Sequence, residues 1–396
     1  MVNNLIALVT GCLLTFGVSA HDHAGHTASG KPDFAKMWQA KLEKAPHLAV
    51  AASFDQNGRL WLARTVGKHL EVSHSDDQGE HFSPPVTVNR SPELIAADGE
   101  SRPQIAVVGA TVYLSWTQDL PQAFAGHIRF SVSNDSGKTF ADPITVNDNL
   151  EPITHRFNSM LADQNGVTIA WIDKRDGVGK SGYKGAAIYT ARSTDGGKSF
   201  ATNQKLADHS CECCRIAMAA DQDGTPLIFW RHIFGVNERD FAIARLDEPH
   251  QRASEDGWKI DACPHHGGSL VVDSQGRKHI AWFTGAEKSP GLHYRNITHN
   301  QMSPPMPFGN LDAQAGHPAL TIAEGTLYLA WREYDGKENR IMAMHSNDRG
   351  QTWSAPSRQS ATPGSADDPL LISDHHATWL IWNTADQGLN VIRLSK

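Results

Sequence analysis

The eight residues SDDQGEHF, at positions 75–82, decide the fold because their pattern returns along the chain. Ser, Asp, Gly and an aromatic residue stand at the same spacing in SNDSGKTF (133–140), STDGGKSF (193–200) and SNDRGQTW (346–353). In a tight turn an Asp side chain accepts hydrogen bonds from the turn amides, and Gly adopts the positive φ that the turn requires. The pattern therefore predicts four equivalent hairpin turns, each with its aromatic side chain tucked beneath.

A second repeat fills the sequence between these turns. Each copy has an apolar run, a turn with Asp or Gly, and a second run that reaches a tryptophan. The tryptophans of the seven copies are Trp61, Trp116, Trp171, Trp230, Trp282, Trp331 and Trp382. A period of about 50 residues is in the range of propeller blades, and each unit reads as four short strands.

The repeated turn resembles the Asp-box, and residues 46–396 resemble the sialidase superfamily of β-propellers, as a member that is not itself a sialidase. The resemblance implies an all-β propeller. Seven copies favour seven blades, with six as the alternative because six is the usual number in sialidases. The last copy ends at Lys396 after three strands, so an N-terminal segment is expected to supply the fourth. Residues 33–44 have a helical pattern and are expected to lie outside the ring.

Composition and the N-terminus indicate an exported protein. The chain has 396 residues, of which 40% are hydrophobic, so its core should not depend on disulfides. A net charge of −7 without a Lys/Arg run argues against nucleic acid as a partner. Residues 1–20 read as a signal peptide, although no Lys or Arg precedes its apolar run. That run is too short ahead of Cys12 to favour lipidation there. We expect a periplasmic or secreted chain without a transmembrane span, whose residues 21–45 form a His-rich segment and a short helix.

The propeller topology sorts residues onto two faces. The repeated turns lie on one face, while the links between blades lie on the other, where binding sites usually occur near the axis. The residues expected on that second face are rich in Arg and in metal-ligand types: His47, Arg102, Asp119, His155, Arg156, Asp173, Cys213, Cys214, Arg215, Arg231, His232, Cys263, His265, His266, His317, Arg332, Glu333, Asp367 and Asp368.

The cysteines suggest a soft-metal site on this face. Three of the four that remain after cleavage lie in CECCR (211–215), and the fourth lies on the next link, so we expect them to be close in space. Thiolates favour Cu(I) or Zn(II), and imidazole suits copper and zinc. The expected ligands are Cys211, Cys213, Cys214 and Cys263, with His265 or His266. Arg215, His232 and His317 are expected to surround them or to bind a small anionic ligand. The alternative is one or two structural disulfides.

The mature N-terminus offers a second copper-compatible feature. His21 supplies the free amine and His23 an imidazole, which with two backbone amides form a square-planar site for Cu(II) or Ni(II). The alternative is a disordered polar tail. The spacing Cys-x-x-Cys that is typical of zinc is absent, which lowers zinc against copper. We therefore expect a copper-binding protein for metal handling or redox chemistry.

Two other function classes remain open. The sialidase resemblance implies three arginines that hold a substrate carboxylate, a Tyr nucleophile helped by Glu, and an Asp acid/base. The residues that would take these roles are Arg102, Arg156, Arg215, Arg332, Glu333, Tyr334 and Asp119. The Arg-Ile-Pro motif of that family is absent before the first Asp-box. The third class is a non-catalytic binding or assembly propeller with structural disulfides, in which loops 119–126 and 174–182 contact a protein partner.

Overall fold

The computed structural model describes residues 40, 47–299, 301–374 and 376–394. The expected signal peptide, Cys12, His21, His23 and the segment expected to complete the last sheet lie outside these residues, as does the helix expected at 33–44 apart from Ala40. The described chain is built of β-strands, with two short 3-10 helices, η1 (Arg175–Gly177) and η2 (Leu311–Ala313). Within it no helix is long and apolar enough to cross a membrane.

The first two sheets are four-stranded antiparallel meanders that pair consecutive strands. Their strands are β1 (Val50–Phe54), β2 (Leu60–Val66), β3 (His69–Ser75), β4 (Val86–Thr87), β5 (Gln104–Val108), β6 (Thr111–Asp119), β7 (Gly126–Ser133) and β8 (Ile144–Thr145). The second strand of each meander is buried along most of its length. A nearly continuous apolar run is what a strand covered on both faces requires.

The next two meanders share one eight-stranded sheet. Its strands are β9 (His155–Asp163), β10 (Gly166–Asp173), β11 (Ala186–Ser193), β12 (Gln204–Ser210), β13 (Ala217–Ala220), β14 (Pro226–Phe234), β15 (Glu238–Arg245) and β16 (Gln251–Arg252). The two halves join where Ser210 of β12 pairs with His232 of β14. The cysteine-rich link therefore begins at the junction between two meanders.

Three more sheets complete the described chain. Their strands are β17 (Ser269–Val272), β18 (Lys278–Thr284), β19 (Gly291–Thr298), β20 (Gln301–Met302), β21 (Met306–Phe308), β22 (Gly316–Ala323), β23 (Thr326–Tyr334), β24 (Asn339–Ser346), β25 (Ser357–Thr362), β26 (Leu370–Ser373), β27 (Thr378–Thr384) and β28 (Gly388–Leu394). The last sheet, β26 to β28, has three strands within the described residues.

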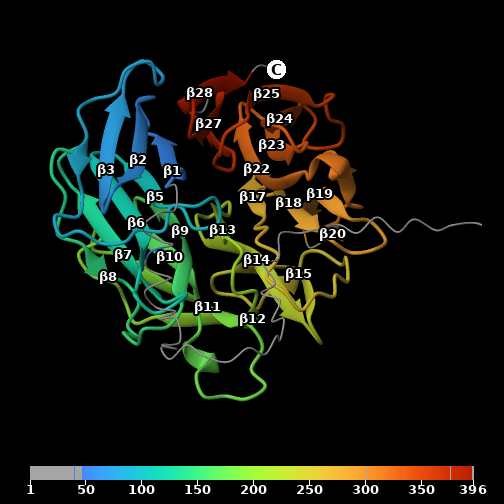
Figure 1. Cartoon of the computed structure of the whole chain (residues 1–396), viewed down its shortest axis with the longest axis horizontal. Helices are drawn as coiled ribbons and strands as arrows, with labels where there is room; N and C mark the ends of the chain where they lie inside the picture. Colours follow the sequence, from blue (N-terminus) through green and yellow to red (C-terminus); the bar gives the residue numbers. More distant parts are fainter. Residues whose placement is uncertain (1–39, 41–46, 300, 375, 395–396) are drawn as a thin grey trace, which may run out of the picture.

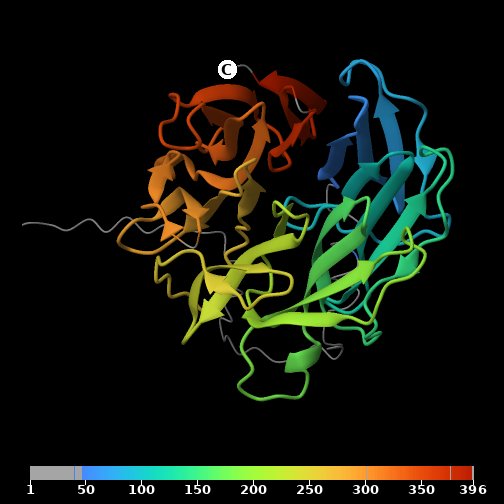
Figure 2. The same cartoon turned by 180° about the vertical axis from the view of Figure 1, so that it is seen from behind.

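The meanders are arranged around a common centre. Their first strands contact one another in sequence order, from β1 through β5, β9, β13, β17 and β22 to β26, and β26 also contacts β1. Figure 1 shows these strands nearest the centre, and Figure 2 shows the same arrangement from behind, with β26–β28 (red) beside β1–β3 (blue). The fold is therefore all-β and propeller-like.

The four predicted turns share the same hydrogen bonds. In the first, the Ser75 hydroxyl donates to Asp77 Oδ1 at 2.7 Å and accepts from the Gly79 N–H at 2.8 Å. The same two bonds form in the turns at 133–140, 193–200 and 346–353. Each turn also packs on a neighbouring sheet. A Cβ on Gly137 would stand 2.5 Å from the Trp61 ring, and one on Gly79 would stand 2.8 Å from Val391 in β28.

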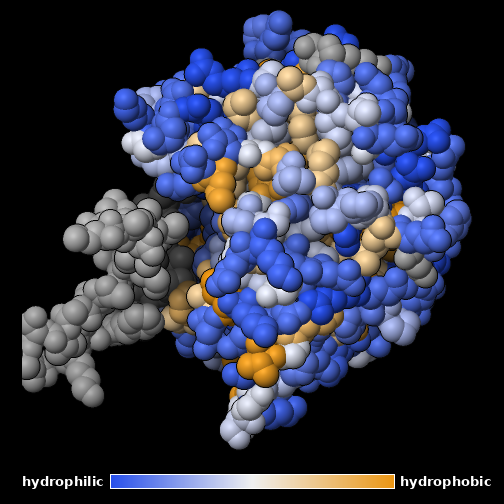
Figure 3. All heavy atoms as spheres, turned by 90° about the vertical axis from the view of Figure 1, so that its right-hand side faces the viewer, coloured by the Kyte–Doolittle hydropathy of each residue, from blue (hydrophilic) through white to orange (hydrophobic). Residues whose placement is uncertain are grey.

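The core lies between the meanders. The indole-bearing side chains Trp116, Trp171, Trp230, Trp282, Trp331 and Trp382 are among the largest that are fully buried. They come from six successive second strands, as the repeat predicts. Figure 3 shows a side of the molecule whose surface is mainly hydrophilic, with apolar side chains scattered in small patches. The apolar residues of the repeat thus hold the sheets to one another.

Candidate metal centre

The centre is formed by the link that connects β12 to β13. Cys211 follows β12 directly, and its N–H donates to the Arg231 carbonyl at 2.8 Å, which continues the pairing of this edge with β14. Cys211, Cys213 and Cys214 are buried and pack in one apolar cluster with Trp230. The link is therefore fixed by β14 on one side and by the core on the other.

The three thiol groups converge. Cys211 Sγ lies 3.9 Å from Cys213 Sγ and 3.8 Å from Cys214 Sγ, and all three sulfurs lie within 4.8 Å of one another. All four described cysteines are free. The arrangement presents three soft donor atoms to one point inside the protein.

The link that leads into β17 contributes fewer ligands than the sequence predicted. Cys263 is exposed and interacts with Cys213, so the fourth thiol does reach the edge of the cluster. His265 is exposed, and the His266 ring stacks on Phe283 with 4.2 Å between centroids. Within the described chain, neither imidazole joins the group of converging sulfurs. The backbone explains this, because Arg231 binds the His266 carbonyl at 3.0 Å and the ring lies toward His317.

Two arginines that the sequence reading did not place at the cysteines are found beside them. Arg239 in β15 donates from Nη1 to Cys211 Sγ at 3.0 Å, and Arg231 in β14 lies behind it. Thiol hydrogen bonds from Cys213 and Cys214, together with these guanidiniums, lower the pKa of Cys211 well below its usual value. Arg231 was expected on this face only because it follows Trp230. Arg239 lies in β15, the third strand of its meander. The only sign of it in the sequence was a charged residue next to the apolar run of that strand.

A cluster of paired charges lies where the links meet near the centre. Glu100 accepts from the backbone N–H groups of Arg215 and Gly267 at 2.8 and 2.9 Å and forms an ion pair with the Arg215 guanidinium at 3.3 Å. His317 Nδ1 lies 3.0 Å from both Glu100 and Asp368. Burial raises the pKa of Glu100, but the Arg215 guanidinium and His317 outweigh burial and hold this pKa below its ordinary value. Segments before β5, β13, β17 and β26 are thus tied to β22.

The arginines assigned to a carboxylate-binding role are already paired. Arg332 forms an ion pair with Asp368 at 3.0 Å, and Arg102 with Asp367 at 3.2 Å. Arg156 lies 3.0 Å from Asp119. Burial raises the pKa of Asp119 to about 6, against the opposing charge of Arg156. These pairs satisfy the guanidiniums within the protein and do not leave three of them converging on one open point.

The expected Glu and Tyr partners are also separated. Glu333 is buried, and its Oε1 accepts from the Trp331 indole at 2.9 Å and from the Asn310 N–H at 3.0 Å. Tyr334 follows it on β23, where successive side chains point to opposite faces, and is partly exposed. Glu333 therefore holds a core indole and does not face the tyrosine.

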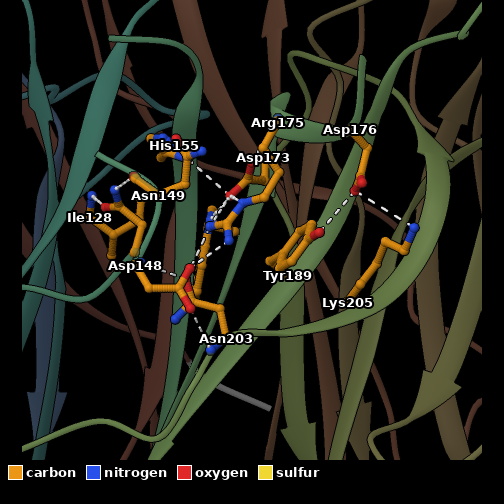
Figure 4. Close-up of polar contacts among 12 residues, drawn as sticks. Ile128, Asp148, Asn149, His155, Asp173, Arg175, Asp176, Tyr189, Asn203 and Lys205 are labelled. Atoms are coloured by element: carbon orange, nitrogen blue, oxygen red, sulfur yellow. Dashed lines mark hydrogen bonds and ion pairs between the residues drawn. The ribbon is translucent and has the colours of Figure 1, made fainter. Parts of the chain in front are cut away.

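Another predicted face residue, His155, belongs to a polar network around Arg175 (Figure 4). His155 Nδ1 lies 2.9 Å from Asp173 Oδ2, which also accepts from the Trp171 indole and from Arg175. The Arg175 guanidinium lies 4.2 Å from the centroid of the Tyr189 ring. The network fixes η1 and the start of the loop at 174–182 against the sheet.

His232 belongs to a group of aromatic rings beside Trp230. Its ring lies 4.6 Å from that of His250 and packs with Phe234. Burial lowers its pKa to about 3, so the ring is neutral near pH 7. Because His232 follows Arg231 on β14, the two side chains point to opposite faces.

Comparisons with known proteins support the fold. No protein-family model matches the sequence, and no curated protein matches it. A polysaccharide lyase, an ulvan lyase, is similar in structure with a TM-score of 0.55 and 11% identity over 89% of this chain and 91% of its own. A lectin from Burkholderia pseudomallei gives a TM-score of 0.56 and 12% identity over 88% of this chain and 99% of its own. An α-L-arabinanase from Penicillium chrysogenum has a TM-score of 0.48 and 14% sequence identity, over 76% of this chain and 92% of its own. The lyase and the lectin, whose TM-scores exceed 0.5, therefore support the all-β, propeller-like fold of this chain.

Proposed function

We propose that this protein binds a soft metal ion, with copper favoured, through Cys211, Cys213 and Cys214. The observation that carries the proposal is the convergence of three buried, free thiols. In a protein of this size such thiols are not needed as covalent staples. The site would serve metal handling or a redox step in an exported, periplasmic or secreted chain.

The sulfur spacing suits a shared ion. Two thiolates bound to one metal at about 2.3 Å stand about 3.8 Å apart in a tetrahedral site and about 4.0 Å apart in a trigonal one. The two distances from Cys211 Sγ, 3.8 and 3.9 Å, fall at these values, and all three sulfurs lie within 4.8 Å of one another. A metal could therefore replace the thiol protons with little movement of the link. Cys263 is available as a fourth or exchanging ligand.

The choice of copper rests on ligand chemistry. Three thiolates without an imidazole are a set that Cu(I) accepts readily. His21 and His23 would give the mature chain a separate Cu(II) site if cleavage follows Ala20. A two-site protein of this kind could bind either oxidation state of the metal.

The test is metal analysis with thiol counting on the protein isolated from the exported fraction. We expect about one copper per chain at the thiols, in addition to any Cu(II) at the N-terminus. The thiol-bound copper should be lost in a Cys213→Ser, Cys214→Ser double variant and kept in His265→Gln. A His23→Gln variant should remove only the Cu(II) that binds outside the thiol cluster. Four oxidised cysteines and no metal in the wild type would refute the proposal.

The finer fold assignment is part of the same proposal. We propose seven blades of the sialidase-superfamily type, with β1, β5, β9, β13, β17, β22 and β26 as their innermost strands. The four shared turns support the Asp-box assignment. The mutual contacts of the seven strands, including β26 with β1, support the blade number.

A second candidate is glycan binding or hydrolysis, which Asp119 favours. A carboxyl with a pKa of about 6 suits a general acid near neutral pH. The paired arginines and the position of Glu333 count against a sialidase mechanism in this chain. Turnover of a fluorogenic sialoside that is lost in Asp119→Asn and Tyr334→Phe would favour the enzyme. A protein recovered in a pull-down, without metal or turnover, would instead favour an assembly module.

A further inference from the structure

Among the residues that the structure describes, two buried guanidiniums beside the cysteines have no carboxylate partner. Arg231 is 1% exposed and Arg239 is 8% exposed. Arg231 donates to the carbonyls of Arg239, His266 and Phe283. Arg239 donates to the Ile260 carbonyl and to Cys211 Sγ. Among the described residues, then, these two cations find neutral carbonyls and sulfur as their hydrogen-bond acceptors.

This differs from the other arginines on the same face. Arg102, Arg156, Arg215 and Arg332 each form an ion pair with an Asp or Glu. An uncompensated buried charge is strongly unfavourable, so each buried cation needs an anion nearby. Arg239 touches Cys211, and Arg231 lies close enough to interact electrostatically with Cys211 and Cys214. The thiols beside both guanidiniums can supply this negative charge when they are deprotonated.

We propose that Arg231 and Arg239 make the thiol site selective for a monovalent soft metal ion, Cu(I) or Ag(I). This inference rests on the proposed metal function and specifies the charge of the ion. Three thiolates carry three negative charges, and the two guanidiniums offset two of them. A monovalent ion then makes the buried site neutral, whereas a divalent ion leaves one positive charge inside the protein.

The charged residue within the cysteine-rich link does not alter this balance. Glu212 lies between two of the ligands in sequence but pairs with Lys174 at 2.7 Å, so that pair adds no net charge. A divalent ion would be balanced only if Cys263 joined as a fourth thiolate. Cys263 is exposed, whereas the other three sulfurs are buried. The participation of Cys263 therefore distinguishes the two charge states.

The experiment measures Kd for Cu(I) and Zn(II) separately on the full mature chain, under anaerobic reducing conditions. Bathocuproine disulfonate competes for Cu(I), and a chromophoric chelator competes for Zn(II). Arg239→Met should weaken Cu(I) binding by about ten- to a hundred-fold, the range seen when a residue behind the ligands is lost. Zn(II) binding should weaken less or strengthen, because the variant site is neutral with a divalent ion. The ratio of the two Kd values should thus shift toward zinc.

Matched variants keep the result interpretable. Arg295→Met removes another buried guanidinium, 6% exposed, that contacts the Ala253 carbonyl and the Met302 sulfur, and it should leave both Kd values unchanged. Arg239→Lys retains the charge and should retain the preference for Cu(I), so it also covers the case in which Arg239→Met does not fold. Cys263→Ser should weaken Zn(II) binding more than Cu(I) binding, because by charge only a divalent ion needs the fourth thiolate.

The outcomes separate the two proposals. If the wild type binds neither ion through its thiols, the metal function itself is wrong. If it binds metal but Arg239→Met weakens Cu(I) and Zn(II) equally, the metal function stands and the charge selection is wrong. A wild type that prefers Zn(II) and requires Cys263 would likewise overturn the charge selection alone.

Discussion

At the scale of single residues, buried charge decides what each part of the centre can do. Glu100 and Asp368 pair with Arg215, Arg332 and His317, so every charged group of this cluster has an opposite charge beside it. Among the described residues, the hydrogen-bond acceptors of Arg231 in β14 and Arg239 in β15 are carbonyls and the Cys211 sulfur, and no carboxylate. Arginine thus has a structural role in the cluster around Glu100, whereas beside the cysteines we propose that it determines the charge of the bound ion.

This cluster of paired charges should be sensitive to loss of Glu100. Glu100→Gln leaves Arg215 without its carboxylate in a buried setting, which should lower the free energy of unfolding by about 3 to 5 kcal/mol at pH 7. Urea titration measures this, with the exposed Glu80→Gln as a control expected near zero. Because the folded-state pKa of Glu100 is lowered, its contribution is present above the unfolded value of about 4.3 and fades as pH falls below it. If the difference in unfolding free energy between Glu100→Gln and the wild type stayed constant down to acid pH, this role for Glu100 would be wrong.

At the scale of elements, the turns between third and fourth strands have two roles. Each joins the two outer strands of a meander, and each packs that meander on a neighbouring sheet. Gly137 has φ +77° and lies against the Trp61 ring, while Gly197 lies against Phe130. These turns and the buried tryptophans could be predicted because local hydrogen bonding and apolar spacing set them. The direction of the His266 ring could not, because it depends on a carbonyl bound by Arg231 from another meander.

A pair of glycine variants separates turn strain from packing. Gly137→Ala and Gly325→Ala both place a Cβ on a left-handed residue, at φ +77° and +75°, but only Gly137 faces a neighbouring side chain. In both variants the strained backbone should lower the free energy of unfolding by about 1 to 2 kcal/mol. Gly137→Ala should lose about 1 to 3 kcal/mol more from the clash with Trp61. Thermal unfolding measures the difference, and equal losses would mean that the turn does not support the packing of the two sheets.

At the scale of the whole molecule, the ring is closed by non-local contacts. Gly79 of the first sheet packs on Val391 of the last, and β1 contacts β26. The period predicted a ring, and the resemblance predicted where links would converge. Neither could predict that Glu100 pairs with Arg215 and His317, because these three residues come from distant segments. Their partners depend on how all the meanders are placed.

His317 should therefore make the stability of the whole ring depend on pH. Burial lowers its pKa, but Asp368 and Glu100 outweigh burial and raise it above the ordinary value. The protonated ring then stabilises the fold fully below about pH 6.5, and this contribution is lost as pH rises through the folded-state pKa. In His317→Gln the free energy of unfolding should be lower than in the wild type at pH 5.5, and the gap should narrow at alkaline pH. The exposed His376→Gln should follow the wild type throughout. A gap that widened as pH rose would show that His317 acts as a neutral ring, and that its two carboxylates are held by Arg215 and Arg332 alone.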